Sequence, residues 1–479
     1  MSELQEKCGL VGAVATSGCD VVESVYLGLY ALQHRGQAGA GIVSRSRRKT
    51  RVHRGMGLVS EIFTPKARDY LAGHMAIGHN RYATTGRATK LRNVQPLLVD
   101  YQGGKLAIAH NGTLVNAVAL RREMESLGSI FQTTTDSELI LHLAARSREP
   151  TMVGRLTEAL GQVAGAVTIL AMDERTLVGY RDPFGFRPLV LGRTGEMILL
   201  ASETCAFDLL GADCLGDVQP GEMVTIEAGR IERRQIAPPK RPLRQCIFEH
   251  IYFARPDSHV FGESVNRIRR ELGAALARRH PADADLVIAV PDSSNAAALG
   301  YSLASGIPFE LGLIRNHYVG RTFIQAGQAH RVSAVRLKFN PVRAVLEGQR
   351  VVVVDDSIVR GTTSRQLVQL LRKGGAREIH FRVASPPIQN PCFYGIDTPT
   401  WEELIAAGDD VEAIRAYVGA TTLGYLTEAD LLASVSHPDD YCLACFSGEY
   451  PTEIPARPDR VPFDSERWRR PSACGEEDA

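Results

Sequence analysis

The sequence has few of the features that mark membrane, secreted or nucleic-acid-binding proteins. No apolar run is long enough to span a bilayer, and the first seven residues, Met-Ser-Glu-Leu-Gln-Glu-Lys, are polar and mixed in charge. We therefore expect neither a secretory signal nor a membrane anchor. The formal net charge of +1 gives no electrostatic case for nucleic acid or an anionic membrane surface. Nine cysteines spread thinly over the chain argue against a disulfide framework and for a reducing compartment, so we expect a cytoplasmic protein.

The length of 479 residues is too great for one ordinary hydrophobic core, and we expect two domains followed by a tail. Up to about residue 234, short β-rich runs alternate with glycine-punctuated turns, and helical patterns cover residues 22–32 and 136–145. This mixture predicts a layered α+β domain. A proline-rich, basic stretch at residues 237–242 then indicates a domain boundary.

The rhythm changes after this boundary. Continuous apolar runs at residues 285–290 and 350–354 are each followed by a polar loop and a helical pattern. Such runs are typical of strands covered on both faces, which predicts a parallel sheet built from βαβ units. The stretch after Cys445 is rich in proline and charge, and we expect it to be extended or partly disordered.

Two neighbouring carboxylates, Asp355 and Asp356, stand at the end of the second apolar run and precede a Ser/Gly/Thr-rich loop and a helical pattern at residues 363–373. The carboxyl end of a parallel strand is where ligands bind, and the start of a helix suits a phosphate. Ribose hydroxyls or a divalent cation would satisfy the acids, so a sugar phosphate with a metal fits better than a nucleotide triphosphate. A Walker loop is excluded because the Gly-Lys-Ser/Thr ending is missing. The alternative is an ordinary helix start with solvated acids.

Cys8 precedes a short β-like run and would by itself be read as a buried strand cysteine. Three other segments offer groups suited to amide chemistry: an arginine near hydroxyls at residues 79–86, an amide and a bare backbone at Asn111-Gly112, and a carboxylate at Asp136. Each also has a plain structural explanation. Arg81 could form a surface pair, Asn-Gly is a strong hairpin signal, and Asp136 could cap a helix.

Four further cysteines lie in the second half: Cys246, Cys392, Cys442 and Cys445. The last two have the C-x-x-C spacing that lets two thiolates reach one metal. The other two are remote in sequence, so the residues alone leave a metal site, a redox pair and unrelated core thiols open.

The acidic segment resembles the phosphoribosyl pyrophosphate motif of type I phosphoribosyltransferases, and the loop at residues 291–295 resembles their pyrophosphate loop. The resemblance implies an α/β domain with a parallel sheet, in which the two aspartates hold the ribose hydroxyls and, together with Ser293, a Mg²⁺ ion. The residues it implies for binding phosphoribosyl pyrophosphate are Asp355, Asp356, Ser357, Val359, Arg360, Gly361, Thr362 and Thr363.

The segments around Cys8 together resemble the class II glutamine amidotransferase domain of the N-terminal nucleophile hydrolases, an αββα sandwich. The resemblance implies that residues 1–7 are a propeptide, removed so that Cys8 becomes the first residue and nucleophile. A free α-amino group has a pKa near ~7.7–8.0 and could then accept the thiol proton. The other roles that the resemblance implies are oxyanion stabilisation by Asn111 and Gly112 and glutamine binding by Arg81, Thr84 and Asp136.

Segments at residues 245–258, 386–397 and 441–446 resemble those of the glutamine phosphoribosylpyrophosphate amidotransferases, specifically the bacterial branch with a [4Fe-4S] cluster. The resemblance implies one cluster per subunit on the four cysteines, with a structural or oxygen-sensing role, and one Mg²⁺ per subunit. It implies transfer of glutamine-derived ammonia to phosphoribosyl pyrophosphate at the start of purine biosynthesis, feedback inhibition by purine nucleotides and a homotetramer. The implied domains are residues 1–7 (propeptide), 8–235 (glutamine amidotransferase), 245–445 (phosphoribosyltransferase) and 446–479 (tail).

Two other functions compete with this reading. A glucosamine-phosphate synthase would share the first domain, but the acidic loop at Asp355 argues against it. A non-catalytic phosphoribosyl-ligand regulator that binds nucleotides or RNA is disfavoured by the near-neutral charge. Residues 315–325 carry cations and glycine and could be either a flap over a pyrophosphate leaving group or an exposed loop.

Overall fold

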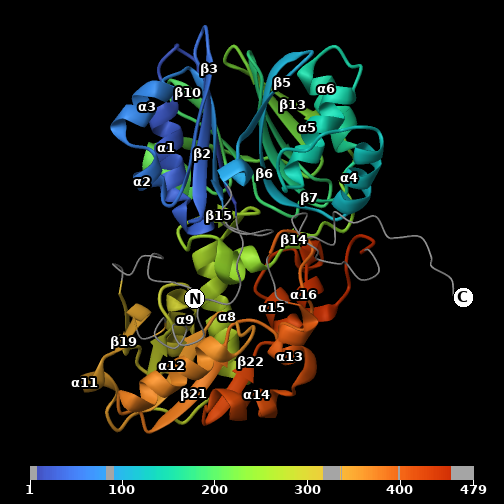
Figure 1. Ribbon diagram of the computed structural model, residues 1–479. Coiled ribbons are helices and arrows are strands. Elements are labelled where there is room, and N and C mark those ends of the chain that lie inside the picture. The colour runs from blue at the N-terminus through green and yellow to red at the C-terminus, as the bar shows by residue number, and fades with distance from the viewer. Residues whose placement is uncertain (1–7, 82–90, 317–334, 336, 397–399, 455–479) are drawn as a thin grey trace, which may run out of the picture. The chain divides into compact units, whose positions relative to one another are not determined.

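The computed structural model describes residues 8–81, 91–316, 335, 337–396 and 400–454, and these fall into two compact units (Figure 1). The amino-terminal unit comprises the described residues of 6–245, 393–396 and 450–479, and the carboxyl-terminal unit those of 246–392 and 397–449. No helix in the described part of the chain is long and apolar enough to cross a membrane.

The amino-terminal unit contains two β-sheets. The seven-stranded sheet has the order β11-β9-β10-β1-β4-β2-β3, with β1 (Gly9–Ala15), β2 (Gly39–Arg45), β3 (Thr50–Met56), β4 (Met75–Arg81), β9 (Val190–Arg193), β10 (Met197–Ala201) and β11 (Asp213–Asp217). The six-stranded sheet has the order β13-β12-β8-β7-β6-β5, with β5 (Leu97–Tyr101), β6 (Gly104–Leu114), β7 (Gly165–Met172), β8 (Thr176–Arg181), β12 (Glu222–Glu227) and β13 (Arg230–Gln235). Neighbouring strands run antiparallel in both sheets.

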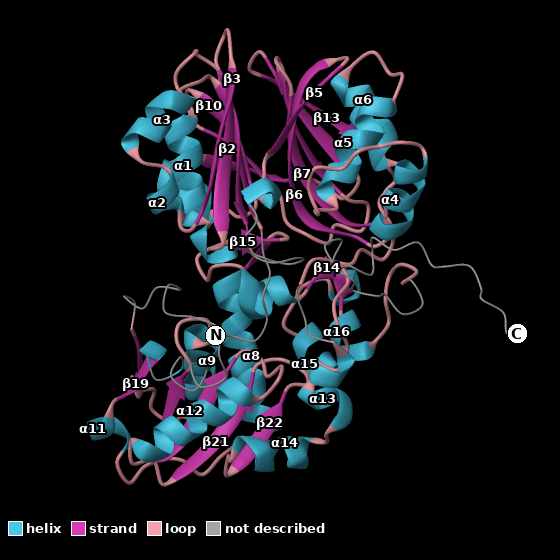
Figure 2. Cartoon of the chain, viewed as in Figure 1, coloured by secondary structure: helices cyan, strands magenta, loops and turns pink. Residues whose placement is uncertain are grey.

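Each sheet carries helices on its outer face (Figure 2). The seven-stranded sheet is covered by α1 (Val22–Ala31), α2 (Val59–Ile62), α3 (Pro65–Leu71) and α7 (Cys205–Leu210), and the six-stranded sheet by α4 (Ala117–Ser126), α5 (Ser137–Arg146) and α6 (Met152–Leu160). A third core, which includes Leu10, Ile77 and Leu170, fills the space between the sheets. This is the expected αββα sandwich, and the helices predicted at residues 22–32 and 136–145 are confirmed to within about one residue.

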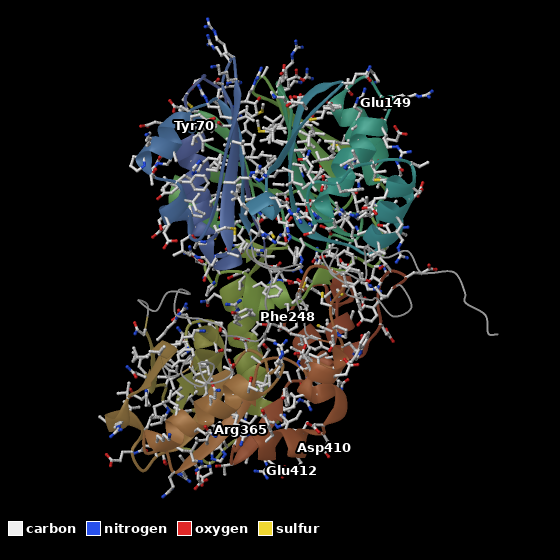
Figure 3. All side chains as sticks on the ribbon, in the orientation of Figure 1. Tyr70, Glu149, Phe248, Arg365, Asp410 and Glu412 are labelled. Carbon is white, nitrogen blue, oxygen red and sulfur yellow. The ribbon has the colours of Figure 1, made fainter. Side chains whose placement is uncertain are left out.

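The carboxyl-terminal unit is built on four parallel strands, β17 (Leu286–Ala289), β20 (Arg350–Asp355), β21 (Glu378–Val383) and β22 (Thr422–Tyr425). On one face the sheet packs against α12 (Thr362–Lys373) and α14 (Val411–Val418). The Arg365 guanidinium of α12 lies 5.0 Å from the ring centre of Tyr417 on α14 (Figure 3). The helices α8 (Val265–Arg279) and α9 (Asn295–Ser305) pack together, and α9 contacts β17 and β20. Because valines of β20 are buried on both faces, the predicted parallel sheet is confirmed.

Shorter elements complete the carboxyl-terminal unit. They are β15 (His259–Val260), β16 (Glu263–Ser264), β18 (Leu313–Arg315), β19 (Phe339–Pro341), β23 (Tyr441–Cys442), α11 (Arg343–Leu346), α13 (Ile405–Gly408), α15 (Glu428–Leu432) and α16 (Ala444–Ser447). We expected the chain to become extended or disordered directly after Cys445. Instead, α16 continues to Ser447.

One short segment departs from the expected division of the chain. Residues Phe393–Ile396 group with the amino-terminal unit, although we expected them within a continuous second domain. The predicted propeptide, Thr84, residues 317–325 of the predicted flap and most of the predicted tail lie outside the described residues.

Candidate active site

Cys8 lies at the start of β1 in the amino-terminal unit and is partly exposed. Strand β1 pairs with β4 so that Gly9 lies opposite Asn80, and this register continued by one residue places Cys8 beside Arg81. The strand is also fixed on its other side, because the Leu10 amide donates to the Ser202 hydroxyl at 3.0 Å. The predicted nucleophile and the predicted glutamine-binding arginine therefore stand at the same end of two adjacent strands.

A buried charged network that the sequence analysis missed lies beside the start of β1. The Glu203 carboxylate is fully buried, binds the Arg35 guanidinium and accepts from His34 Nε2 at 2.7 Å. A Cβ on Gly9 would stand 3.5 Å from Cβ of Arg35, so this network packs directly against the strand that follows Cys8. No spacing in the sequence joins residues 34–35 to Glu203, and their contact depends on the fold.

Asn111 and Gly112 lie in the interior of β6 and not in a hairpin turn. Gly112 has φ +145°, and a Cβ there would stand 2.0 Å from the Ala166 carbonyl oxygen on β7, so only glycine fits. The Asn111 side chain is 3% exposed, and its Nδ2 has no hydrogen-bond partner within the described part of the chain. A buried amide donor without a partner is costly, which indicates that it is kept for a ligand.

Arg81 is buried at 4% exposure, so the surface-pair explanation is wrong. Its charge and that of His110, after the larger effect of burial, lower the pKa of His79 to about 3, so this imidazole is neutral. The same interactions show that the end of β4 lies close to β6. Arg81 therefore has no competing positive charge on the neighbouring His79.

Asp136 precedes α5, but its carboxylate does not cap the helix. One oxygen accepts from the Leu114 amide at 2.8 Å, and the other lies 3.7 Å from Nδ1 of His110. Burial opposes its ionisation, but the hydrogen bonds and the charge of His110 outweigh burial, and the pKa of Asp136 falls below its usual value. A carboxylate is therefore present near β6 at neutral pH and could bind an ammonium group.

The two loops predicted in the carboxyl-terminal unit come together. Strands β17 and β20 are adjacent and parallel, so both loops emerge from the same edge of the sheet. The Ser293 hydroxyl donates to Asp356 at 2.6 Å, and the Ser294 hydroxyl lies 3.4 Å from Asp355. The loop after Asp356 ends at Gly361, with φ +72°, before α12 begins at Thr362.

Two cations lie near the acids: Arg315, the first residue of the predicted flap, and Lys338, which the sequence analysis did not assign to this site. Arg315 binds the Asp292 carboxylate at 2.6 Å, and it pairs with Phe339 in the ribbon of β18 and β19. Lys338 precedes β19, and the negative charges of Asp292, Asp355 and Asp356 act on its ammonium group. Its pKa is lowered, first by burial and then by Arg315, against the effect of the three acids. A lone lysine outside any motif gives no sequence signal, and only the ribbon brings it here.

Asp355 and Asp356 are both buried. Burial, followed by the negative charge of Asp356, raises the pKa of Asp355 well above its usual value. An aspartate whose pKa is raised on folding destabilises the fold once it ionises, and this cost grows as pH rises through the unfolded and then the folded pKa. A bound divalent cation would neutralise the pair.

The four cysteines of the carboxyl-terminal unit share one neighbourhood. Cys246 and Cys442 end the two strands β14 (Gln245–Cys246) and β23, which form a small sheet. Burial raises the pKa of Cys445 well above its usual value, and Cys442, Cys392 and Cys246 raise it further. The ring of Phe248, which is labelled in Figure 3, stacks on that of Phe446, the residue after Cys445, with ring centres 5.5 Å apart.

The described residues contain no group of three or more His, Cys, Asp or Glu side chains placed to hold a single metal ion. The effect of the other three thiols on the pKa of Cys445 nevertheless shows that the four thiols lie near one another. A cubic cluster binds each thiolate through a different iron, so its four ligands surround a larger body than one ion. Four thiols in one neighbourhood are the type of ligand that an iron–sulfur cluster takes.

Comparison with known proteins gives close relatives over almost the whole chain. A model of the glutamine amidotransferase domain matches residues 79–208. The amidophosphoribosyltransferase of Methanothermobacter thermautotrophicus is 47% identical over 459 residues, which are 95% of this chain and 96% of the relative. That of Bacillus subtilis is 49% identical over 458 residues, 94% of this chain and 95% of the relative.

Two solved structures are similar in fold and sequence. One, described as the allosteric regulatory enzyme of purine biosynthesis, has a TM-score of 0.89 at 48% identity and covers 95% of this chain and 98% of its own. The other is the glutamine phosphoribosylpyrophosphate amidotransferase from B. subtilis complexed with ADP and GMP. Its TM-score is 0.88 at 48% identity, with 94% of this chain and 98% of its own covered.

The buried acidic pair leads to a prediction about stability. Asp355→Asn keeps the acceptor for the Asp356 amide but removes the unfavourable charge, so we expect a higher melting temperature at pH 7 without divalent metal. A gain of 1 kcal/mol corresponds to about 2–4 °C for a unit of this size. The gain should shrink as pH falls toward ~4, where the wild-type carboxyl is protonated. Thermal melts in chelator check this, with the exposed Asp283→Asn as control; an equal or lower melting temperature for Asp355→Asn would contradict it.

Proposed function

The chain belongs to the amidophosphoribosyltransferase family, and from that premise we propose which of its residues carry each half of the reaction. The enzyme transfers ammonia from glutamine to phosphoribosyl pyrophosphate and yields 5-phosphoribosylamine, glutamate and pyrophosphate, the first step of purine biosynthesis. Its relatives and the acidic loop leave no support for fructose 6-phosphate as acceptor or for a non-catalytic regulator.

Cys8 is the proposed nucleophile of the glutaminase half. Its sulfur attacks the amide carbon of glutamine, the amide nitrogen leaves as ammonia, and water then hydrolyses the thioester to glutamate. The thiol proton needs an acceptor, and the α-amino group of Cys8 supplies one once residues 1–7 have been removed. That group, with an ordinary pKa near ~7.7–8.0, is partly unprotonated close to neutral pH, and this fraction can accept the proton.

The removal of residues 1–7 is directly testable. We expect the intact mass of active enzyme purified from its host to correspond to a chain that begins at Cys8. Glutaminase activity should appear together with this mass when a precursor is followed over time. Full glutaminase turnover by a chain that retains the first seven residues would contradict the role of the α-amino group.

The buried donor on Asn111 carries the glutaminase assignment. The tetrahedral intermediate places negative charge on the former amide oxygen, and Asn111 Nδ2 with the Gly112 N–H would bind it. Arg81 would bind the glutamine α-carboxylate and Asp136 its α-ammonium, because each carries the opposite charge, Arg81 in a buried and Asp136 in a partly buried position. Thr84 is proposed as a further glutamine contact on resemblance alone.

The carboxyl-terminal unit is proposed to bind phosphoribosyl pyrophosphate. Asp355 and Asp356 would hold the ribose hydroxyls and, with Ser293, Mg²⁺, which offsets the charge of the pyrophosphate group as it leaves. The proposed 5′-phosphate site is Ser357, Val359, Arg360, Gly361, Thr362 and Thr363 at the start of α12. Arg315 and Lys338 would face the pyrophosphate. Ammonia attacks C1 as the bond from C1 to the pyrophosphate oxygen breaks.

Cys246, Cys392, Cys442 and Cys445 are proposed to hold a [4Fe-4S] cluster in a structural or oxygen-sensing role, as in the iron–sulfur branch of the family. One relative was solved with ADP and GMP, which supports feedback inhibition by purine nucleotides. A homotetramer in the cytoplasm completes the proposal on the strength of family resemblance.

Loss of the buried donor tests the glutaminase assignment. We expect Asn111→Ala to lower kcat of glutamine-dependent synthesis about 10²–10³-fold, the usual cost of one oxyanion donor, with a much smaller change in KM for glutamine. Synthesis from added ammonium should stay within about twofold, because it bypasses this step, and Cys8→Ala gives the baseline. Asn116→Ala, at the start of α4, is the control. Equal losses with glutamine and ammonium would contradict the assignment.

Metal analysis tests the cysteine assignment. Protein purified without oxygen should contain about four iron and four sulfide per chain and absorb visible light. Cys442→Ser should lose both and unfold at a lower temperature, whereas Cys214→Ser, at an exposed position outside the group, should retain them. Zinc in the wild-type protein, or unchanged iron in Cys442→Ser, would refute the cluster.

A further inference from the structure

The segment Phe393–Ile396 belongs to the amino-terminal unit, although the stretches of chain before and after it belong to the carboxyl-terminal unit. Tyr394 is 3% exposed and Ile396 4% exposed, so the segment is part of the interior of that unit. Neither the acidic loop nor the glutamine-binding residues proposed above include it. Its contacts nevertheless lead to the proposed oxyanion site.

Phe186, Arg187 and Thr452 each contact Tyr394. Its ring stacks on Phe186, with centres 4.3 Å apart and planes inclined by 15°. Its carbonyl oxygen accepts from Nε and Nη2 of the buried Arg187 at 3.2 and 3.0 Å. Its hydroxyl lies 2.9 Å from that of Thr452 and accepts from the Thr452 amide at 3.1 Å. Buried hydrogen bonds to a charged donor are stronger than neutral ones, so the backbone at residue 394 is firmly placed.

Gly395 then meets Gly112 directly. A Cβ at residue 395 would stand 3.2 Å from Cα of Gly112 and 3.2 Å from Nη2 of Arg187, and Gly395 has φ +102°. The two glycines thus allow two backbones to approach with no side chain between them. The Ala166 carbonyl oxygen also lies close to Gly112, at 2.0 Å from the position of a Cβ there.

The turn that carries Arg187 is joined to the strand behind Asn111 and Gly112. Val167 and Thr168 of β7 are the cross-strand partners of Gly112 and Asn111. The Val167 amide donates to Asp182 at 3.1 Å, and the Thr168 hydroxyl donates to the Arg187 carbonyl oxygen at 3.4 Å. Asp182 also accepts from the Phe184 amide at 3.0 Å, which closes the turn. One connected set of hydrogen bonds therefore links β7, the turn and the segment.

We propose that Tyr394 and Gly395, held by Arg187, are positioning residues of the glutaminase half. Gly395 packs against Gly112, and this contact fixes the position of the hydrogen-bond donors of Gly112 and Asn111. The inference rests on the proposed oxyanion role of those two residues. Because Gly395 contacts Gly112, the segment would act on catalysis through the position of Gly112. Small displacements of a catalytic group cost about 10²-fold per ångström, which makes such support consequential.

Gly395→Ala is the direct test, because the added methyl group presses on Gly112. The matched control is Gly216→Ala in β11, which has a similar φ of +107° and no atom within 4 Å of the added Cβ. Both variants strain the backbone alike, but only one touches the oxyanion strand. The kinetics of glutamine- and ammonium-dependent synthesis and the melting temperature are measured for each. Tyr394→Leu, which removes the stacking and the Thr452 bonds, is the second variant.

We expect Gly395→Ala to lower kcat with glutamine about tenfold or more relative to Gly216→Ala, with KM for glutamine and ammonium-dependent synthesis changed less than about threefold. Tyr394→Leu should lower the same kcat by a smaller factor. Equal glutamine kcat in Gly395→Ala and Gly216→Ala would overturn the positioning role, and so would equal losses with glutamine and ammonium. If Cys8→Ala still hydrolyses glutamine at the wild-type rate, the proposed role of Cys8 itself fails, whatever the Gly395 and Tyr394 variants do.

Discussion

The Ala166 carbonyl oxygen approaches Gly112 so closely that no side chain can stand there, and the glutaminase half of the molecule depends on this contact. It keeps β6 pressed onto β7 and leaves the Asn111 amide buried, without a partner in the described part of the chain. An unsatisfied buried donor costs roughly 1–3 kcal/mol. Three apolar cores in the same unit provide the stability that offsets it. A donor held in this way needs no rearrangement when charge develops on the substrate.

The carboxyl-terminal unit also buries polar groups at an energetic cost, but here they are carboxylates and not a hydrogen-bond donor. Two acids are buried next to each other at the end of β20, and burial together with the charge of Asp356 raises the pKa of Asp355, so its ionised form is less stable there than in water. A serine of the neighbouring loop donates to Asp356, and a cation of a separate ribbon pairs with Asp292 in the same loop. Each unit thus retains one unfavourable electrostatic arrangement that substrate or metal can complete.

Local patterns predicted much of this from the sequence. The valine run of β20 and its acidic end are contained in one stretch of chain, so the parallel sheet and the Asp355–Asp356 site could be found directly. Asn-Gly was ambiguous, because the same pair suits a hairpin turn, and only the register with β7 shows that it lies within a strand. Glu203, Lys338 and Tyr394 were missed. Each acts through residues far away in sequence, and no periodicity or motif encodes such a contact.

The path of the chain through Phe393–Ile396 also bears on how such enzymes can be cut and recombined. A fragment ending at residue 245 would lack the aromatic ring that covers Phe186 and the carbonyl that binds Arg187. A buried guanidinium would then face a gap, and an apolar surface would be opened to solvent. Shuffling the two halves as contiguous gene segments would therefore separate parts that fold as one body, and a graft would have to carry this short insertion along.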